Sequence, residues 1–373
     1  MAKKILVTGG AGFIGSHIVD ALVEKGYDVI IYDNLCPQVH KNGKKPKYLN
    51  KNAKFIKDDV LDYDKLKKVI LQVNAIFHKA AMVGVGQSQY EIRKYTEVNE
   101  LGTANLLDII VNNKNKIEKI IVAASMSSYG EGAYICKKHG RLRPPLRSNE
   151  QMLEKKWELY CPHCGKELTP TAVTEDDRQN CNSIYAINKK TQEEMVMNIC
   201  QTYNIPGVAL RYFNVYGPRQ SLSNPYTGVA AIFMSRIKNN KSPIIFEDGR
   251  QSRDFISVYD IARANILALE NSKADYQIFN VGTGQPLQIK QIAEILAKLY
   301  GKDIKLEILN KFCKGDVRHC FADISKIEKT LGFKIKYSFE EGMKNLIEWA
   351  HTADADDLVD NAINELKKHK LTL

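Results

Sequence analysis

Apolar residues follow two different spacings along the first 130 residues of the chain. Nearly unbroken apolar runs at 5–8, 28–32 and 119–124 are typical of strands that are buried on both faces. Between them, the stretches 62–73 and 95–112 place their apolar residues on one helical face. Strands that alternate with helices in this way predict an α/β fold with a doubly wound parallel sheet, whose ligands bind at the carboxyl ends of the strands.

Residues 131–182 interrupt this alternation with a basic, proline-punctuated run and several cysteines. The pattern of helices and strands resumes at Ser183, and the last third of the chain has shorter elements. We therefore divide the chain into a core of 1–130 together with 183–215, an insert at 131–182, and a smaller α/β region at 216–373. Some segments of this last region should return to the core.

The composition is that of an ordinary globular protein, with 44% hydrophobic and 26% charged residues. No apolar run approaches the roughly 18 residues of a membrane span, and a strand pattern begins directly after Lys4, which leaves no room for a signal peptide. We therefore expect a cytoplasmic protein without membrane partners, whose eight cysteines bind metal or stay free. The net charge of +11 comes from lysines spread along the chain, which is typical of a solvated surface but would also attract anionic ligands.

Three glycines connect the first predicted strand to the helix that follows it. Gly9, Gly12 and Gly15 have a G-x-x-G-x-x-G spacing. Such a turn brings free backbone N–H groups and a helix N-terminus to one point, which suits a pyrophosphate, although a tight turn without a ligand would also use glycine. Asp33 ends the next strand about 20 residues further on, where a carboxylate would bind a ribose 2′-hydroxyl and repel a 2′-phosphate. The pattern predicts NAD as the cofactor.

Tyr185 and Lys189 lie four residues apart on one face of a predicted helix. A phenol is a poor base at its ordinary pKa of about 10. A nearby ammonium and an oxidised nicotinamide ring would both lower the pKa of Tyr185 and allow it to move a proton. Ser125 ends a predicted strand and would hydrogen-bond the reacting substrate oxygen, and Ser127 and Ser128 are the alternatives for that role.

The insert contains a C-P-x-C-G motif of the kind that forms zinc knuckles, in which a turn aims two thiolates at one ion. Two more cysteines flank the motif and could complete a closed, structural zinc site. The candidate ligands are Cys136, Cys161, Cys164 and Cys181, with His139 or His163 as a substitute. Free or redox-active thiols in a surface loop are the alternative.

Taken together, these motifs resemble those of the extended short-chain dehydrogenase/reductases, and in particular the NAD-dependent sugar-nucleotide epimerase/dehydratase family. The resemblance covers nearly all of the chain except 131–182. Beyond the motifs above, it rests on Asp59-Val60, 78–81, Asn99, Tyr129-Gly130, 211–219, 248–255 and 315–318. It implies a Rossmann-type NAD-binding domain, a smaller C-terminal domain that binds a sugar nucleotide, and a zinc-ribbon-like insert. It also implies a homodimer in which the helices at 95–112 and 186–203 form a four-helix bundle.

The resemblance assigns a role to individual residues. Cofactor-binding positions are Gly9, Gly12, Phe13, Ile14, Gly15, Asp33, Asn34, Asp59, Val60, Ala80, Ala81, Asn99, Tyr185, Lys189, Tyr212 and Phe213. Substrate-binding positions are Val85, Ser125, Ser127, Asn214, Val229, Phe246, Arg253 and Arg318. Among these, Arg253 and Arg318 would hold the diphosphate with their forked guanidinium groups. Relatives often have an arginine where this chain has Cys313, so Lys311 or Lys314 could make that phosphate contact.

The resemblance also narrows the activity. Dehydratases of this family have an Asp-Glu pair after the active-site hydroxyl residue, whereas this chain has Met126 and Ser127. The implied activity is therefore that of a 4-epimerase, in which Tyr185 takes the proton of the sugar 4-hydroxyl while NAD takes the C4 hydride and returns it to the other face. The segments 83–92 and 220–229 are most similar to dTDP-L-rhamnose 4-epimerases and UDP-glucose 4-epimerases.

Other functions remain as alternatives. Within the same fold these are a nucleotide-sugar dehydrogenase or 4-ketoreductase, which would consume external cofactor, and a 4,6-dehydratase. A nucleic-acid-binding protein that uses the knuckle and the positive charge is the alternative from another class. We disfavour it and expect no nucleic-acid partner, because few aromatic residues accompany the knuckle beyond Trp157 and Tyr160.

Overall fold

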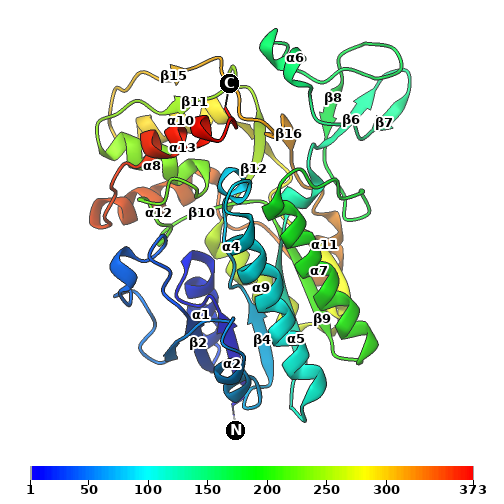
Figure 1. Ribbon diagram of the computed structural model, residues 1–373, viewed down its shortest axis with the longest axis vertical. Coiled ribbons are helices and arrows are strands. Elements are labelled where there is room, and N and C mark those ends of the chain that lie inside the picture. Colours follow the sequence, from blue (N-terminus) through cyan, green and yellow to red (C-terminus); the bar gives the residue numbers. More distant parts are fainter. Residues whose placement is uncertain (1, 373) are drawn as a thin grey trace.

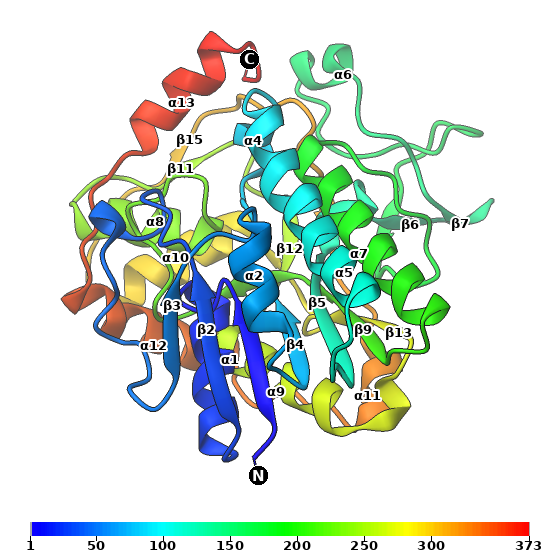
Figure 2. The same ribbon diagram turned by 60° about the horizontal axis from the view of Figure 1, so that its bottom comes forward.

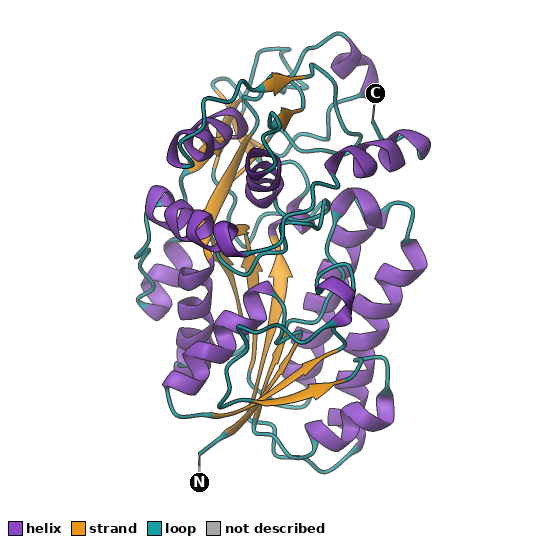
Figure 3. Cartoon of the chain, turned by 90° about the vertical axis from the view of Figure 1, so that its left-hand side faces the viewer, coloured by secondary structure: helices purple, strands orange, loops and turns teal. Residues whose placement is uncertain are grey.

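The computed structural model describes residues 2–372 and has a seven-stranded parallel sheet at its centre (Figures 1 and 3). The strand order is β13-β9-β5-β4-β1-β2-β3. The strands are β1 (Lys4–Thr8), β2 (Asp28–Asp33), β3 (Lys54–Lys57), β4 (Ala75–His78), β5 (Lys119–Ser125), β9 (Gly207–Tyr212) and β13 (Gln277–Val281). Because the order reverses between β1 and β4, the connections leave a crevice there at the carboxyl edge. The predicted doubly wound sheet is confirmed.

Helices cover both faces of this sheet (Figure 3). One face holds α1 (Phe13–Glu24), α9 (Val258–Glu270) and α11 (Ser325–Leu331), and the other holds α2 (Tyr63–Ile70), α5 (Gly102–Asn112) and α7 (Ile184–Thr202). Successive side chains of β1 point to opposite faces of the sheet and belong to two different cores. Ile5 and Val7 pack beneath α1, and Leu6 packs beneath α2. This explains why the strands read as nearly unbroken apolar runs.

The long helix expected at 95–112 is built from three pieces. It begins with α4 (Ile92–Thr96), passes through a π turn at Glu97–Leu101 and continues as α5. A short helix, α3 (Val85–Ser88), precedes it. Figure 2 shows α5 and α7 side by side on the outside of the molecule.

A smaller unit sits above the carboxyl edge of the main sheet (Figure 1). Its sheet contains β10 (Asn214–Tyr216), β12 (Ser252–Ser257), β14 (Pro286–Gln288) and β16 (His319–Cys320), and a two-stranded sheet pairs β11 (Ile244–Ile245) with β15 (Glu307–Ile308). Its helices are α8 (Val229–Lys238), α10 (Ile289–Leu299), α12 (Phe339–Thr352) and α13 (Val359–Lys368). Phe233, Leu296 and Leu346 lie in its separate core. In contrast, α9, β13 and α11 from the same part of the sequence pack on the main sheet.

The segment 131–182 folds as a small lobe that projects at the upper right of Figure 1. It has a three-stranded antiparallel sheet in the order β7-β6-β8, with β6 at Ala133–Cys136, β7 at Gly140–Leu142 and β8 at Thr169–Thr171, and a short helix α6 (Asn149–Leu153). Tyr134, Leu159 and Leu168 form its own apolar cluster together with Cys136 and Cys161. Within residues 2–372, no helix has the length and apolar character that crossing a membrane requires.

Candidate active site

The glycine turn after β1 is packed too closely for side chains. A Cβ on Gly15 would lie 2.2 Å from the Gly9 carbonyl oxygen, and a Cβ on Gly9, whose φ is +66°, would lie 2.7 Å from the Ala80 nitrogen. The α1 helix starts after Gly12 without a side-chain cap, so its first N–H groups are free to bind an anion. These features fit the diphosphate of a dinucleotide.

Asp33 ends β2 beside this turn, as predicted. Its carboxylate accepts hydrogen bonds from the backbone N–H groups of Ala11 at 3.0 Å and Leu35 at 2.8 Å. The side chain is therefore held in place and also fixes the glycine turn. Asn34 and Asp59 lie next to it and are joined by a hydrogen bond of 2.7 Å from the Asn34 amide to the Asp59 carboxylate.

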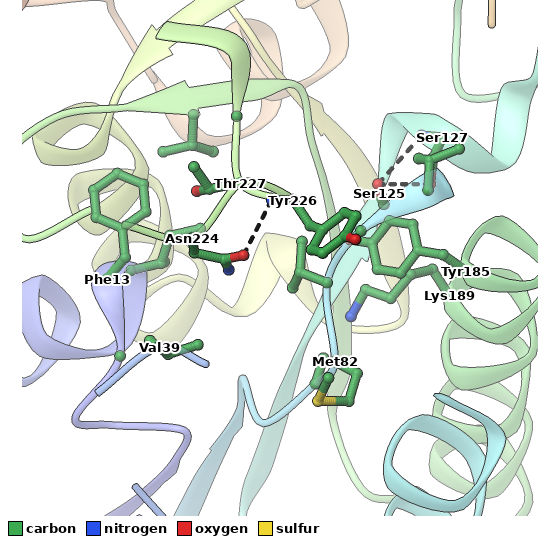
Figure 4. A pocket seen from close by; sticks show the side chains of 18 of the residues that line it. Phe13, Val39, Met82, Ser125, Ser127, Tyr185, Lys189, Asn224, Tyr226 and Thr227 are labelled. Atoms are coloured by element: carbon green, nitrogen blue, oxygen red, sulfur yellow. Dashed lines mark hydrogen bonds between the residues drawn. The ribbon is translucent and has the colours of Figure 1, made fainter. Parts of the chain in front are cut away.

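A cavity of about 660 Å³ runs from the glycine turn to the smaller unit (Figure 4). Most of the predicted site residues line it. These are Gly9, Gly12, Phe13, Ile14, Gly15, Asp33, Asn34, Asp59, Val60, Ala80, Ala81, Val85, Ser125, Ser127, Tyr185, Lys189, Tyr212, Phe213, Asn214 and Val229. Asn99 lies behind the wall, where its side chain is fully buried and pairs with the backbone N–H and C=O of Met82 at 2.8 and 3.1 Å. It positions the wall without lining the cavity.

The predicted catalytic groups meet at one end of the cavity (Figure 4). Ser125 ends β5, and its hydroxyl oxygen accepts hydrogen bonds from the backbone N–H of Ser127 at 3.2 Å and from the Ser127 hydroxyl at 2.9 Å. Tyr185 lies in the first turn of α7, and the Ser88 hydroxyl accepts from its backbone N–H at 3.0 Å. Lys189 follows one turn later on the same face, as the sequence spacing predicts.

The protein groups alone do not give Tyr185 the lowered pKa that we expected. Burial raises the pKa of Tyr185, and the Ser125 hydroxyl lowers it only in part. Burial also lowers the pKa of Lys189 to about 7, although the negative charge of Glu193 raises it in part. The Lys189 amine donates a hydrogen bond to Gln192 Oε1 at 2.6 Å. The Lys189 amine is thus bonded to Gln192 in this structure, and it favours the Tyr185 phenolate when it is protonated.

Lys79 is a cavity residue that the sequence analysis missed. Its amine donates to the Tyr212 hydroxyl at 3.0 Å, and desolvation together with the charge of Lys189 holds its pKa well below the ordinary value. A lysine directly after the apolar strand β4 was the sequence signal that could have identified it. Its hydrogen bond ties the wall after β4 to the end of β9.

Three predicted substrate contacts lie away from the cavity. Arg318 is fully buried, and its guanidinium group pairs with Glu247 at 2.9 Å, Asp248 at 2.7 Å and Glu158. Arg253 donates to the Asp316 carboxylate at 2.8 Å. Phe246 lies in the same region, away from the cavity. Carboxylates pair with both guanidinium groups in this structure, and the contact of Arg253 and Arg318 with a diphosphate stays a prediction. The cations that line the cavity, among residues 2–372, are Lys79, Lys189 and Lys314.

The insert brings together four possible metal ligands, and one of them differs from our prediction. The ligand atoms of Cys136, His139, Cys161 and Cys164 all lie within 4.8 Å of one another. Cys181 is not among them, because it lies beside the start of α7, where its thiol donates to the carbonyl oxygens of Ser128 and Ala186 at 3.5 and 3.4 Å. His139 takes its place, since the β6–β7 hairpin turns it back towards Cys161, 3.3 Å from Sγ.

The cluster has the chemistry of a zinc site. Three sulfur atoms and one imidazole nitrogen form a closed set of the kind found in structural zinc sites. Gly165, with φ of +69°, follows the second knuckle cysteine, and its N–H donates to the Cys161 carbonyl at 2.8 Å. The backbone N–H of Lys138 is the main group that lowers the pKa of Cys136 to about 6, which favours the thiolate that a metal needs.

Comparison with known proteins agrees with this geometry. Residues 162–282 match the model of the NAD dependent epimerase/dehydratase family, and residues 6–144 match that of GDP-mannose 4,6 dehydratase. The chain is 34% identical to the dTDP-L-rhamnose 4-epimerase of Burkholderia thailandensis, over 93% of this chain and 94% of that protein. It is 35% identical to a putative UDP-glucose 4-epimerase of Methanocaldococcus jannaschii, over 92% and 97% of the two chains.

Solved structures give the same picture. The UDP-glucose 4-epimerase of Thermotoga maritima with UDP-glucose superposes with a TM-score of 0.76 at 30% identity, over 93% of this chain and 98% of the other. The UDP-glucose 4-epimerase of Thermus thermophilus in complex with NAD gives a TM-score of 0.75 at 27% identity, over 94% and 100%. The family resemblance inferred from the sequence is confirmed, and the chain belongs to the NAD-dependent epimerase/dehydratase family.

Proposed function

We propose that the protein is an NAD-dependent nucleotide-sugar 4-epimerase that acts on a dTDP- or UDP-linked hexose, of the dTDP-L-rhamnose or UDP-glucose type. The observation that carries the proposal is the meeting of Ser125, Tyr185 and Lys189 at the end of a cavity that begins at the glycine turn. The relatives named above are a dTDP-L-rhamnose 4-epimerase and a putative UDP-glucose 4-epimerase, and both align over nearly their whole length.

The residues have complementary roles in this reaction. NAD, when bound by the glycine turn and Asp33, supplies a hydride acceptor that returns the hydride to the opposite face of C4. The Tyr185 oxygen accepts the proton of the sugar 4-hydroxyl and gives it back, while the Ser125 hydroxyl holds the same sugar oxygen. Lys189 stabilises the phenolate when its amine is protonated. Met126 and Ser127, which line the cavity beside Ser125, offer no carboxylate for the elimination of water, which supports epimerisation over dehydration.

The test is incubation with a panel of dTDP- and UDP-hexoses without added NADH, with the products identified by NMR. We expect inversion at C4 of at least one sugar and no net change in cofactor. Stoichiometric consumption of external NAD(H) would instead identify a dehydrogenase or 4-ketoreductase, and loss of water would identify a 4,6-dehydratase. If no sugar is inverted, the proposal is rejected.

We propose further that Cys136, His139, Cys161 and Cys164 hold one structural Zn²⁺ ion. A closed set of four protein ligands leaves no open position for catalysis. Elemental analysis should find about one zinc per chain, and Cys161→Ser should lose it. Cys181→Ser is the matched control and should keep the metal, because its thiol lies outside the cluster. Loss of zinc from Cys181→Ser would instead restore the ligand set predicted from the sequence, and retention of zinc by Cys161→Ser would contradict both sets.

We also propose a homodimer in the cytoplasm. The outer side of α4, the π turn and α7 exposes Ile92, Leu101 and Ile187, which supports pairing with a second copy. Leu101→Glu should convert the dimer to a monomer in light scattering, whereas an unchanged mass would argue against this face. We keep the division into an NAD-binding domain (1–130 and 183–215), the insert (131–182) and a mainly substrate-binding domain (216–373).

A further inference from the structure

Two parts of the insert, called here its arms, bind the same short segment of the smaller unit, Arg318 and His319. The first arm is Glu131, just before β6, whose carboxylate accepts hydrogen bonds from the backbone N–H groups of Arg318 at 2.8 Å and His319 at 3.1 Å. The Tyr134 hydroxyl donates to the same carboxylate at 2.7 Å. A Cβ on Gly132 would lie 2.0 Å from the His319 carbonyl oxygen, so the two backbones are in direct contact.

The second arm is Glu158, which approaches the same segment from the other side of the insert. Its carboxylate accepts from Arg318 Nε at 3.1 Å and lies 3.2 Å from His319 Nε2. Although partial burial raises its pKa, the hydrogen bonds from His319 and Arg318 hold the pKa of Glu158 at about 2, so the side chain is ionised. Leu159, the next residue, packs in the cluster that contains Cys136 and Cys161.

Residues 318 and 319 directly follow a stretch of chain that forms part of the cavity wall. Cys313, Lys314 and Asp316 line the cavity. The insert fixes this wall a second time through Arg147, which pairs with Glu247 at 2.8 Å and donates to the Asp316 carbonyl oxygen at 3.2 Å. Asn182, at the end of the insert, donates to the Gly315 carbonyl oxygen. Of the three lysines that line the cavity, Lys79 is bonded to the Tyr212 hydroxyl and Lys189 to Gln192. Lys314 is therefore the one that is available for a phosphate.

The order of residues along the chain connects these arms to the metal cluster. Glu131 is followed five residues later by Cys136, and Glu158 is followed three residues later by Cys161. The sulfur atoms of Cys136 and Cys164 are 3.7 Å apart, so an ion bound there joins both arms at their base. Besides the ion, the apolar cluster around Leu159, the pairing of β6 with β8 and the hydrogen bond from the Leu168 N–H to the Leu159 carbonyl oxygen at 2.9 Å connect the arms.

We propose that the metal-bound insert is a clamp that holds the wall at 313–316 in place and thereby sets the affinity for the nucleoside diphosphate of the substrate, without taking part in hydride transfer. The proposal rests on the zinc site and the nucleotide-sugar substrate proposed above. Glu158 is then a positioning residue, which acts through Arg318 and His319. The wall carries no reacting group, so loss of the clamp should change binding and leave the chemical step intact.

The experiment uses the full chain with its metal and compares Glu158→Gln with Glu154→Gln. Glu154 lies in the same segment but is exposed and pairs with its neighbour Lys156, which makes it the matched control. Arg147 and Arg318 still face the carboxylates of Glu247 and Asp248 in the Glu158→Gln variant, so their charges remain balanced. Calorimetry gives the dissociation constants of UDP and dTDP, and steady-state kinetics gives KM and kcat.

We expect Glu158→Gln to weaken binding of the diphosphate and to raise KM by about threefold to thirtyfold. The value of kcat, the zinc content and the bound NAD should stay as in the wild type, and Glu154→Gln should match the wild type throughout. Removing the metal with a chelator should weaken binding similarly, and added Zn²⁺ should restore it.

Wild-type affinity in Glu158→Gln, or a fall in kcat at unchanged KM, would overturn the clamp. If the chelated protein unfolds, Glu158→Gln decides the question, because it keeps the metal. Failure of the wild type itself to bind UDP or dTDP would instead refute the proposed substrate, and the clamp with it.

Discussion

His78 makes the stability of the protein sensitive to acid through a hydrogen-bond arrangement that leaves no place for a second proton. Its ring is fully buried, with Nδ1 2.8 Å from the Thr8 hydroxyl and Nε2 3.0 Å from the Thr103 hydroxyl. The Thr8 oxygen already accepts from the backbone N–H groups of Lys79 and Ala80, so its proton goes to Nδ1. If the ring were doubly protonated, the Nδ1–H group would point at the Thr8 hydroxyl hydrogen, and the hydrogen bond between them would be lost.

Burial, with smaller contributions from the charges of Lys189 and Lys79, lowers the pKa of His78 from 6.5 to about 3. The unfolded chain therefore binds this proton at a higher pH than the folded protein does, and stability falls as the pH drops from 6.5 towards 3. Between pH 7.5 and 4.5 the loss due to His78 is about 2.5 kcal/mol. His17, whose pKa burial lowers to about 4, adds a loss of the same sign.

The assay is urea unfolding at several pH values, followed by circular dichroism, for the wild type and His78→Asn. The variant is less stable throughout, but it should lose about 2.5 kcal/mol less than the wild type between pH 7.5 and 4.5. His351→Asn, which changes an exposed histidine of α12, serves as the control and should follow the wild type. If His78→Asn and the wild type lose the same free energy over this range, the reasoning is wrong.

Three further predictions concern the cavity. Tyr185→Phe should slow C4 inversion by about 10²- to 10⁴-fold with unchanged thermal stability and bound NAD; an undiminished rate would refute its role. Gly15→Ala should lower the free energy of unfolding in urea by about 1–3 kcal/mol and also abolish NAD binding, because the new Cβ would lie 2.2 Å from the backbone. Gly26→Ala is the control and should keep the cofactor, because its Cβ would meet nothing within 4 Å. Lys79→Met should raise the free energy of unfolding at pH 7 by roughly 1 kcal/mol. This gain should shrink towards pH 10, where the lysine of the unfolded chain also begins to lose its proton; a constant difference would contradict the prediction.

The core of the fold could be predicted from the sequence because the strands of the main sheet are buried on both faces. Successive residues of β1 and β2 supply two different cores, which produces the apolar runs and leaves little ambiguity about the element type. The glycine turn, Asp33 and the Tyr185/Lys189 pair were also predictable, because each depends on local spacing within one strand, turn or helix.

Features that depend on distant residues could not be read in the same way. Cys181 was chosen as a ligand because it is a cysteine near the knuckle, yet the β6–β7 hairpin brings His139 to that position instead. Arg318 was expected at the diphosphate, but no spacing along the chain reveals that carboxylates from residues 158, 247 and 248 converge on it. Both outcomes are set by tertiary packing, which sequence periodicity does not record.

The direct contact between Gly132 and the His319 carbonyl joins parts of the chain that are synthesised at different times. Glu131 and Arg318 are 187 residues apart, which corresponds to about 10–40 seconds of translation. During that interval Glu131 and Glu158 lack the partners in residues 318 and 319 that they have in the folded protein. The lobe is therefore made before its partner segment, and its contacts with that segment form only after residues 318 and 319 have left the ribosome.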